Sequence, residues 1–152
     1  DLVLLECQLD GIVRRAVRRF AGEFIGRKLK LCYEPLNVSC VTDEKWLLFV
    51  IEQVLSNALK YTRAGSITIE LEAPKTLVIR DTGIGVAPED LPRIFEKGYT
   101  GYNGRGDQKA SGLGLYLCRT ICKRLGHTIT ASSVPDHGTA IRITLEQRQV
   151  RE

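Results

Sequence analysis

One long apolar segment restricts the fold of this chain more than any other part of the sequence. Residues 43–61 carry apolar side chains on nearly every face of a helix: Trp46, Leu47, Leu48, Phe49, Val50, Ile51, Val54, Leu55 and Ala58. Thr42 or Asp43 is placed to cap its N-terminus, with Glu44 in the first turn. A helix that is apolar nearly all round must be buried. The sequence therefore predicts a core built around this helix.

The remaining elements mix hairpins with helices. Alternation and turn residues predict strands at 2–6, 29–34, 35–41 (after a turn), 66–72, 76–80, 127–134 and 139–146. Helical spacing predicts helices at 11–26, capped by Asp10, and at 113–125, ending at Gly126, with a short helix at 89–96 inside the long loop 82–111. This order indicates an α+β fold: a single domain over 1–152, with one mainly antiparallel sheet covered on one face by about three helices.

Composition and charge exclude several classes of protein. The chain has 152 residues and a dispersed net charge of +4, and its RRAVRR run at 14–19 is interpreted as a solvated helix face, so we expect no nucleic-acid partner. Five cysteines without a CxxC pair favour a reducing compartment, and we expect Cys118 and Cys122 to be small buried residues. The sequence contains no methionine and no apolar stretch that could span a membrane. We expect a fragment of a longer protein, whose membrane segments lie in a missing N-terminal part.

Four polar side chains interrupt the apolar helix. Gln53, Asn57, Lys60 and Tyr61 follow one stripe, with spacings of four (53 to 57), three (57 to 60) and four (57 to 61). Buried polar groups without partners cost about 1–3 kcal/mol each, so such a row suggests a partner outside the helix. A polar network within the core is one alternative. A helix end that emerges into water is another, and it accounts for Lys60 and Tyr61 better than for Asn57.

Two glycine clusters raise the question of a bound ligand. DTGIG at 81–85 follows the predicted strand TLVIR, and by itself it is either an ordinary turn or a place where a ligand approaches the backbone. ASGLGLYL at 110–117 puts glycines at the start of a helix, where backbone N–H groups favour phosphate. Neither cluster fits the dinucleotide fingerprint, and the P-loop and protein-kinase motifs are absent.

Five segments in order give the chain its family resemblance. EQVLSNALKYT (52–62), DTGIG (81–85), RIFEKGYTG (93–101), ASGLGLYL (110–117) and GTAIRITL (138–145) resemble the N box, first glycine box, F box, second glycine box and closing GT hairpin of sensor histidine kinase catalytic domains. Ala110 departs from the pattern, replacing the first glycine of the second box. These domains belong to the gyrase, heat-shock chaperone, histidine kinase and mismatch-repair ATPase superfamily. The segment KWLLFVIEQVLSNALKYT (45–62) and the short lid are most similar to those of Gram-positive sensor kinases that respond to cell-envelope antibiotics. The implied fold is a two-layer α/β sandwich, the Bergerat fold, with a mobile ATP lid.

The resemblance implies a site for ATP and Mg²⁺. Asp81 would accept a hydrogen bond from the adenine amino group, because a carboxylate only accepts. Asn57 would bind magnesium through its amide oxygen, Lys60 would meet a phosphate, and Tyr61 would line the adenine pocket. The remaining cofactor-binding residues are Gly83, Ile84 and Gly85 near the base and sugar; Phe95 as lid anchor; Lys97, Arg105 and Lys109 as lid cations among which the sequence does not choose; Ser111, Gly112, Leu113, Gly114 and Leu115 around the phosphates; and Thr139, joined to Asp81 through water.

The resemblance also implies what the domain transfers and to which partner. The superfamily's ATPases carry a general-base glutamate at the position of Gln53, and Gln53 cannot take a proton, so free ATP hydrolysis should be poor and Gln53 should support magnesium or its water. His127 and His137 do not match the phosphoacceptor motif and are expected to be structural or solvated. The γ-phosphoryl group would pass to a histidine on the dimerisation domain of the same homodimeric kinase and then to a response regulator. The chain would be the cytoplasmic part of a membrane-anchored kinase. The alternatives are a non-catalytic nucleotide-binding module and a stand-alone ATPase.

Overall fold

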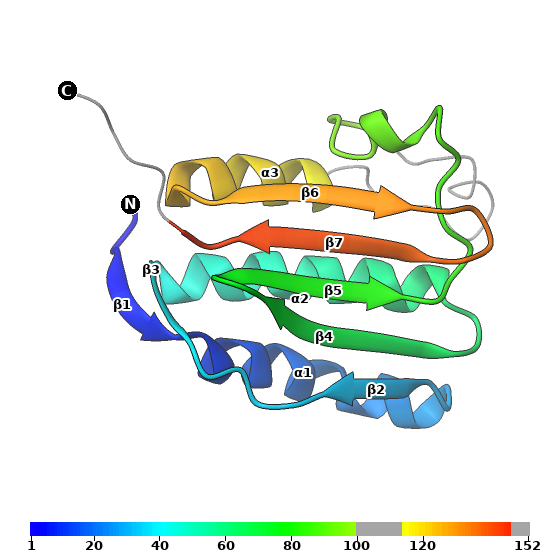
Figure 1. Cartoon of the computed structure of the whole chain (residues 1–152), viewed down its shortest axis with the longest axis horizontal. Coiled ribbons are helices and arrows are strands. Elements are labelled where there is room, and N and C mark those ends of the chain that lie inside the picture. The colour runs from blue at the N-terminus through cyan, green and yellow to red at the C-terminus, as the bar shows by residue number, and fades with distance from the viewer. Residues whose placement is uncertain (100–113, 147–152) are drawn as a thin grey trace.

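The computed structural model describes residues 1–99 and 114–146 (Figure 1). Its elements, in chain order, are β1 (Leu5–Gln8), α1 (Leu9–Gly26), β2 (Lys30–Tyr33), β3 (Ser39–Thr42), α2 (Glu44–Tyr61), β4 (Ser66–Glu72), β5 (Thr76–Asp81), the 3₁₀ turn η1 (Leu91–Arg93), α3 (Gly114–Leu125), β6 (Thr128–Ser133) and β7 (Thr139–Thr144). Every predicted long helix and hairpin is present within a few residues of its expected bounds.

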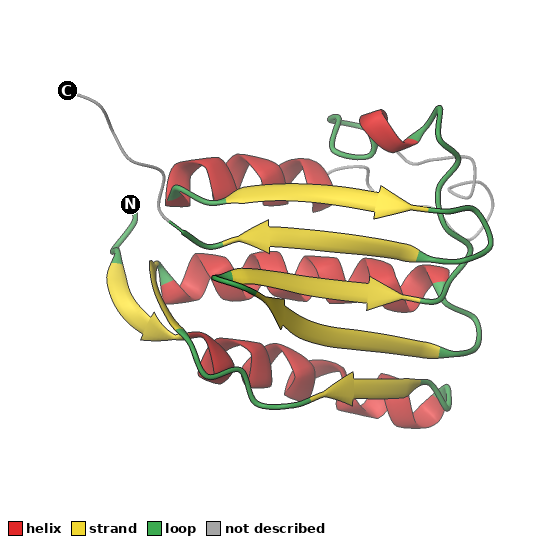
Figure 2. Cartoon of the chain, in the orientation of Figure 1, coloured by secondary structure: helices red, strands yellow, loops and turns green. Residues whose placement is uncertain are grey.

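Five of the described strands form a mixed sheet, and helices α1, α2 and α3 lie on one face of it (Figure 2). The strand order is β2-β4-β5-β7-β6, and only the β2–β4 pair is parallel. β1 and β3 do not join this sheet, as a single predicted sheet would require, but pair with each other as a separate antiparallel ribbon. The α+β, two-layer prediction is confirmed.

Helix α2 lies at the centre of the helical layer, in contact with both α1 and α3. Leu47, Val50, Ile51 and Leu55 have no exposed surface, and Glu44 and Lys45 are its exposed residues. The Asp43 carboxylate accepts a hydrogen bond from the Trp46 backbone at 3.1 Å, which confirms it as the N-cap. The buried central helix follows directly from its all-round apolar pattern.

The predicted role of Asp10 as a helix cap was wrong. Helix α1 begins at Leu9, and the Asp10 carboxylate instead accepts hydrogen bonds from the Leu36 backbone, at 2.9 Å, and from the Tyr33 hydroxyl. A carboxylate in the first helical turn accepts from whichever donors the fold brings to it, and here those donors come from the end of β2 and from the loop that follows it. The short helix expected at 89–96 is reduced to the single turn of η1.

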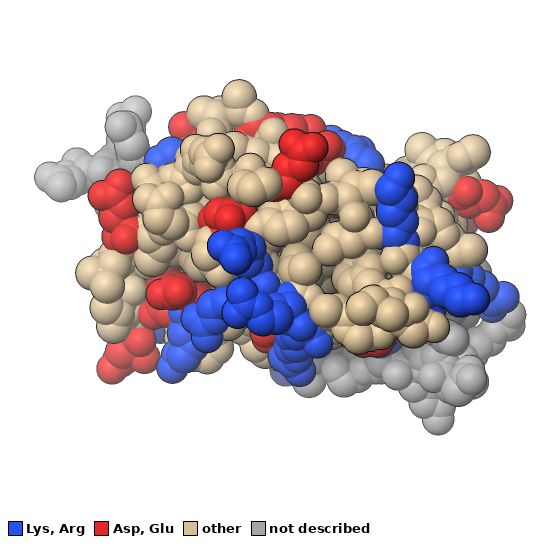
Figure 3. Space-filling view, turned by 90° about the horizontal axis from the view of Figure 1, so that it is seen from below, with Lys and Arg blue, Asp and Glu red and all other residues tan. Residues whose placement is uncertain are grey.

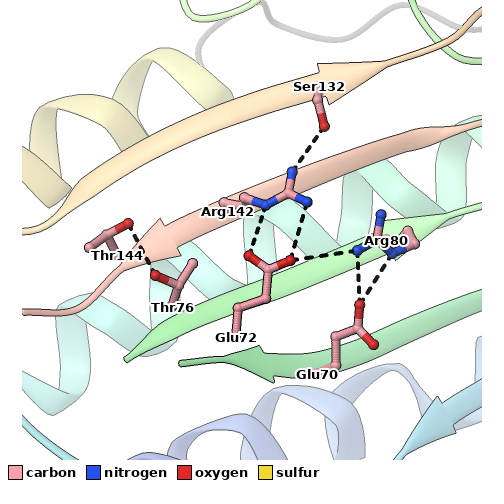
Figure 4. Close-up of polar contacts among 7 residues, drawn as sticks. All are labelled: Glu70, Glu72, Thr76, Arg80, Ser132, Arg142 and Thr144. Atoms are coloured by element: carbon pink, nitrogen blue, oxygen red, sulfur yellow. Dashed lines mark hydrogen bonds and ion pairs between the residues drawn. The ribbon is translucent and has the colours of Figure 1, made fainter. Parts of the chain in front are cut away.

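On the face of the five-stranded sheet that no helix covers, charged and polar side chains form a network of ion pairs and hydrogen bonds (Figure 4). Arg80 donates to Glu70 at 2.9 Å, and Arg142 donates to Glu72 at 3.1 Å and to Ser132 at 3.0 Å. Val78, which lies between these strands opposite Glu70 and Arg142, has no exposed surface. The long charged side chains therefore shield apolar surface on this face, as their methylene stems allow.

The RRAVRR segment is a solvated face of α1, as predicted. Its arginines are exposed; Arg15 pairs with Glu44 at 3.5 Å and Arg19 with Glu52 at 2.8 Å. Figure 3 shows basic side chains gathered on this side of the molecule beside acidic ones. In the described part of the chain, no helix is long and apolar enough to cross a membrane.

The buried cysteines and the two histidines also follow the predictions. Cys118 and Cys122 are buried in α3, and His137 is exposed in the β6–β7 turn. His127 is 2% exposed, and its Nε2 lies 3.0 Å from the Thr42 hydroxyl, while its Nδ1 has no hydrogen-bond partner among the described residues. Burial lowers the pKa of His127 to about 4.

We expect the stability of the fold to depend on the neutral form of His127. The pKa of His127 in the folded state lies below the ordinary value of 6.5. The stabilisation that depends on its neutral imidazole is therefore complete above pH 6.5 and is lost as pH falls toward 4. The expected slope is roughly 1.4 kcal/mol per pH unit below pH 6.5, which amounts to about 2 kcal/mol at pH 5 and about 3 kcal/mol at pH 4. Urea unfolding between pH 7.5 and 5 measures it. His127→Gln should remove the slope and His137→Gln should keep it; equal slopes in both variants would contradict this assignment.

Candidate functional site

Three segments distant in sequence meet at one end of the sheet, on the right in Figure 1. They are the C-terminal turn of α2, the DTGIG loop after β5, and the β6–β7 turn. The backbone N–H of Ile84 donates to the Tyr61 carbonyl at 3.1 Å, and the Ile84 carbonyl accepts from the Asp136 backbone at 2.7 Å. The DTGIG loop is therefore held on both sides by main-chain hydrogen bonds.

Asp81, the last residue of β5, is the buried carboxylate of this region. It is 9% exposed, and its Oδ1 accepts from the backbone N–H groups of Gly83, at 2.9 Å, and Thr139, at 3.2 Å. Burial raises the pKa of Asp81, and the two N–H donors oppose that rise. Among the described residues, no donor reaches the second carboxylate oxygen. That oxygen can accept a hydrogen bond from a donor that is not part of the described chain.

Thr139 contacts Asp81 through its main chain. Its backbone N–H bonds directly to the carboxylate, and its hydroxyl lies 3.0 Å from Ser133 Oγ. Ser133 in turn donates to the Gly138 carbonyl and accepts from the Val86 backbone, each at 2.8 Å. The side-chain hydroxyls thus fasten the β6–β7 turn to the loop, and the main chain of Thr139 reaches the carboxylate. Sequence reasoning did not single out Ser133.

The glycines are required by the close approach of the chain to itself. A Cβ on Gly83 would lie 2.2 Å from the Tyr61 carbonyl oxygen, and one on Gly85, at φ +74°, would lie 2.4 Å from that of Val134. Gly138, at φ +94°, would place its Cβ 1.9 Å from the Asp81 carbonyl oxygen. At all three positions the main chain leaves no room for the Cβ of any other residue. The fold alone therefore accounts for these glycines. Gly138 was missed as a site residue, although the PDHG turn signal marked it.

The polar stripe on α2 is half-buried, and its first residue, Gln53, lies beside the start of α3. Gln53, Asn57, Lys60 and Tyr61 are all partly accessible, and a Cβ on Gly114 would lie 3.2 Å from Gln53 Oε1. Burial raises the pKa of the Tyr61 phenol. Glu52 is turned away from the stripe and forms its ion pair with Arg19 of α1. The stripe therefore carries two amides, a lysine and a phenol, and no carboxylate.

The structure describes some of the residues predicted for the lid and for the start of α3, and the others lie outside the described ranges. Phe95 is buried in the core, with the Arg119 guanidinium 5.9 Å from its ring, and Leu115 packs against the same core. Lys97 is exposed, with its amine 5.9 Å from the Tyr116 ring. Arg105, Lys109, Ser111, Gly112 and Leu113 lie outside the described residues.

Two further residues that sequence reasoning missed support the end of α2. Arg27, just after α1, donates to the carbonyls of Leu59, at 2.6 Å, and Thr62, at 2.8 Å, and so caps the C-terminus of α2 with a positive charge. Thr62 is fully buried, and its hydroxyl has no hydrogen-bond partner in the described part of the chain. Within the same residues, no three His, Cys, Asp or Glu side chains are grouped closely enough to hold a metal ion.

A family model and several curated proteins match most of this chain. Residues 42–149 match the family model described as histidine kinase-, DNA gyrase B-, and HSP90-like ATPase. The chain is 35% identical to the sensor histidine kinase YxdK of Bacillus subtilis, over 95% of this chain and 45% of the relative, and 37% identical to GraS of Staphylococcus haemolyticus, over 97% and 41%. It spans less than half the length of these curated relatives.

Solved structures show the same fold. The catalytic domain of the histidine kinase ThkA superposes with a TM-score of 0.81 at 20% identity, covering 93% of this chain and 96% of that domain. Full-length ShkA in complex with AMPPNP superposes with a TM-score of 0.80 at 22% identity, covering 94% of this chain and 31% of ShkA.

We expect Gly83→Ala to destabilise the protein by about 1–3 kcal/mol, because the new Cβ meets the Tyr61 main chain and cannot be relieved by a rotamer change. Gly22→Ala is the matched control: nothing lies within 4 Å of its Cβ position on α1, and the change should stabilise the helix by up to about 1 kcal/mol. Urea unfolding of both variants measures the difference. Equal stability of Gly83→Ala and the parent would contradict the observed packing.

Proposed function

Because the chain belongs to the histidine kinase-, DNA gyrase B-, and HSP90-like ATPase family, we propose that it is the ATP-binding catalytic domain of a two-component sensor histidine kinase. It binds Mg-ATP and donates the γ-phosphoryl group to a histidine of the kinase's dimerisation domain, from which a response-regulator aspartate receives it. The sensor kinases among its relatives support this choice within the family.

The observation that carries the proposal is the buried carboxylate of Asp81. Two backbone N–H groups fix one carboxylate oxygen, which leaves the other to accept from the 6-amino group of adenine. Guanine presents an acceptor at that position, and two acceptors facing each other without a donor are unfavourable in a buried site. The same pocket therefore discriminates ATP from GTP. Gly83, Ile84 and Gly85 form the adjacent wall, and Tyr61 lies beside them at the end of α2.

The phosphate side of the site is assigned to α2 and the start of α3. Magnesium requires only one or two protein ligands when substrate phosphates supply the rest. The amide oxygen of Asn57 can serve as such a ligand without an acidic cluster, and none is present among the described residues. Lys60 neutralises phosphate charge, and Gln53, beside Gly114, supports the ion or its water. The lid cations Lys97, Arg105 and Lys109 are the candidates for the γ-phosphate.

The proposed reaction is transfer to a histidine, with little hydrolysis. The acidic neighbour of Gln53, Glu52, is paired with Arg19 on the far side of the helix and is not available as a base for water. An imidazole acceptor needs no such base. We propose that the acceptor domain precedes this chain in a homodimeric, membrane-anchored kinase, and that this domain is cytoplasmic. We also propose that the kinase responds to cell-envelope antibiotics; the sensor proteins GraS and BceS are among its relatives.

Asp81→Asn should lower the affinity for a non-hydrolysable Mg-ATP analogue by on the order of 30- to 150-fold. The amide oxygen can still accept from Gly83 and Thr139, which directs its NH₂ group toward the adenine amino group, donor against donor. Isothermal titration calorimetry measures the loss, with the GTP analogue as comparator. Asp136→Asn, an exposed carboxylate in the neighbouring turn, is the control and should bind as the parent does. Equal affinity for both variants would remove Asp81 as the adenine contact.

Asn57→Ala should lower phosphotransfer at least about 100-fold, since it removes the proposed magnesium ligand. The chain is incubated with radiolabelled Mg-ATP and the dimerisation domain of a relative such as YxdK, and acid-labile, base-stable label on that domain is measured. Asn37→Ala, the same change on an exposed loop, should leave transfer intact. Nucleotide binding without transfer would favour a non-catalytic module, and steady ATP turnover by the chain alone would favour an ATPase.

A further inference from the structure

Two cysteines are opposite each other in the antiparallel β1–β3 ribbon, which lies at the left edge of Figure 1. Cys7 of β1 and Cys40 of β3 are direct partners in the antiparallel register. Directly opposite residues of an antiparallel pair place their side chains on the same face. Both thiols are free in the structure. We propose that Cys7 and Cys40 are a redox-sensitive pair that forms a reversible disulfide.

The register places the two residues at a separation that a disulfide can span. Leu9 donates to the Val38 carbonyl, so that pair is a hydrogen-bonded one. Because such pairs alternate along the ribbon, Cys7 and Cys40 also form a hydrogen-bonded pair, with Cα atoms about 5.5 Å apart. Disulfides join Cα atoms separated by about 4.4–6.8 Å.

The ribbon also has room to adjust. Opposite Cβ atoms lie about 4.5–5.5 Å apart in such pairs, and a disulfide brings them to about 3.5–4.5 Å. Closing this gap twists one pair of residues in a ribbon of four-residue strands that is separate from the five-stranded sheet. The core sheet does not have to move.

Of the two cysteines, Cys7 is the one that solvent can reach. Cys7 is half-buried and lines an open groove of about 380 Å³, together with Val3, Leu5 and Leu48. Cys40, which is 2% exposed, lies behind it in the core. A small oxidant therefore reaches Cys7 first, and Cys40 is placed to complete the bond. Cys118 and Cys122 have at most 1% exposure, and Cys32 pairs with Thr68, so none of these offers the same arrangement.

The oxidant we assign is a low-molecular-weight disulfide. The Cys7 thiolate attacks one sulfur of the small disulfide and releases one small thiolate, forming a mixed disulfide. The Cys40 thiolate then attacks the Cys7 sulfur and releases the second small thiolate. The two cysteines lose two protons and two electrons, and the small disulfide is reduced to two thiols.

The surroundings of both thiols slow their reaction with an oxidant. Burial raises the pKa of Cys7, with Glu44 and Asp43 adding to the rise, and burial raises the pKa of Cys40 to about 11. Few thiolates exist at neutral pH, so exchange is slow there. A transient disulfide of this kind is compatible with the reducing compartment that the cysteine count predicts. The pair lies near the N-terminus of α2, at the other end of that helix from Asn57, so the inference does not depend on the proposed function.

The test is oxidation of the chain by oxidised glutathione at pH 8.5, where more of each thiol is ionised. After alkylation of the remaining thiols, intact mass and peptide mapping should show loss of two hydrogens and a Cys7–Cys40 cross-link. The thermal midpoint should rise by roughly 5–10 °C, because the cross-link restricts the unfolded chain, and dithiothreitol should reverse both changes.

Serine variants identify the residues. Cys7→Ser should abolish the cross-link, as should Cys40→Ser, whereas Cys32→Ser, the matched control on β2, should retain it. Cys7 is partly exposed, so its variant remains informative if Cys40→Ser fails to fold. A stable glutathione adduct on Cys7 without a cross-link, a cross-link between other cysteines, or no reaction of the folded chain would each overturn the inference.

Discussion

The burial of α2 against the sheet, between α1 and α3, is the constraint on which the rest of the structure depends. Most of this helix is removed from water, and the free energy of burying so many large apolar side chains fixes its position. Once the helix is fixed, its ends are fixed too. Its N-terminus is closed by Asp43 and its C-terminus by Arg27. The polar stripe from Gln53 to Tyr61 can then sit at the edge of the core without depending on its own hydrogen bonds for placement.

The candidate site forms because the last turn of α2 also anchors the DTGIG loop. Main-chain hydrogen bonds from Ile84 N–H to the Tyr61 carbonyl, and from Asp136 N–H to the Ile84 carbonyl, connect three segments that are far apart in the sequence. Such contacts require backbones to approach more closely than a Cβ permits, which is why glycine occupies positions 83, 85 and 138. Rigid placement of this loop in turn orients the Asp81 carboxylate, with one oxygen engaged and the other available. Preorganisation of this kind is what a selective binding site needs.

The carboxylates of this chain illustrate how context decides the role of one residue type. Asp43 and Asp10 both lie near the start of a helix in the sequence, yet only Asp43 caps its helix. Asp10 accepts from Tyr33 and Leu36, residues that no local pattern links to it. Glu52 and Gln53 are neighbours on α2, and one forms an ion pair with α1 while the other faces α3. The 100° rotation per helical residue was sufficient to predict that last separation, since it is a local property of the helix.

The sequence by itself determined the elements, the two-layer α+β class and the set of motifs. Apolar periodicity, turn residues and helix caps act over a few neighbouring residues, and they are visible without the fold. Through the family resemblance it also singled out Asp81, the stripe on α2 and the glycine boxes as candidate site residues, and the structure brings Tyr61, at the end of that stripe, beside the DTGIG loop. Only the tertiary structure decided which donors hold Asp81, that Thr139 contacts it through the main chain, that Arg27 caps α2, and that Cys7 faces Cys40. Each of these depends on the register and packing of segments distant in sequence, which are set by the burial of the whole core and are not encoded in any local pattern.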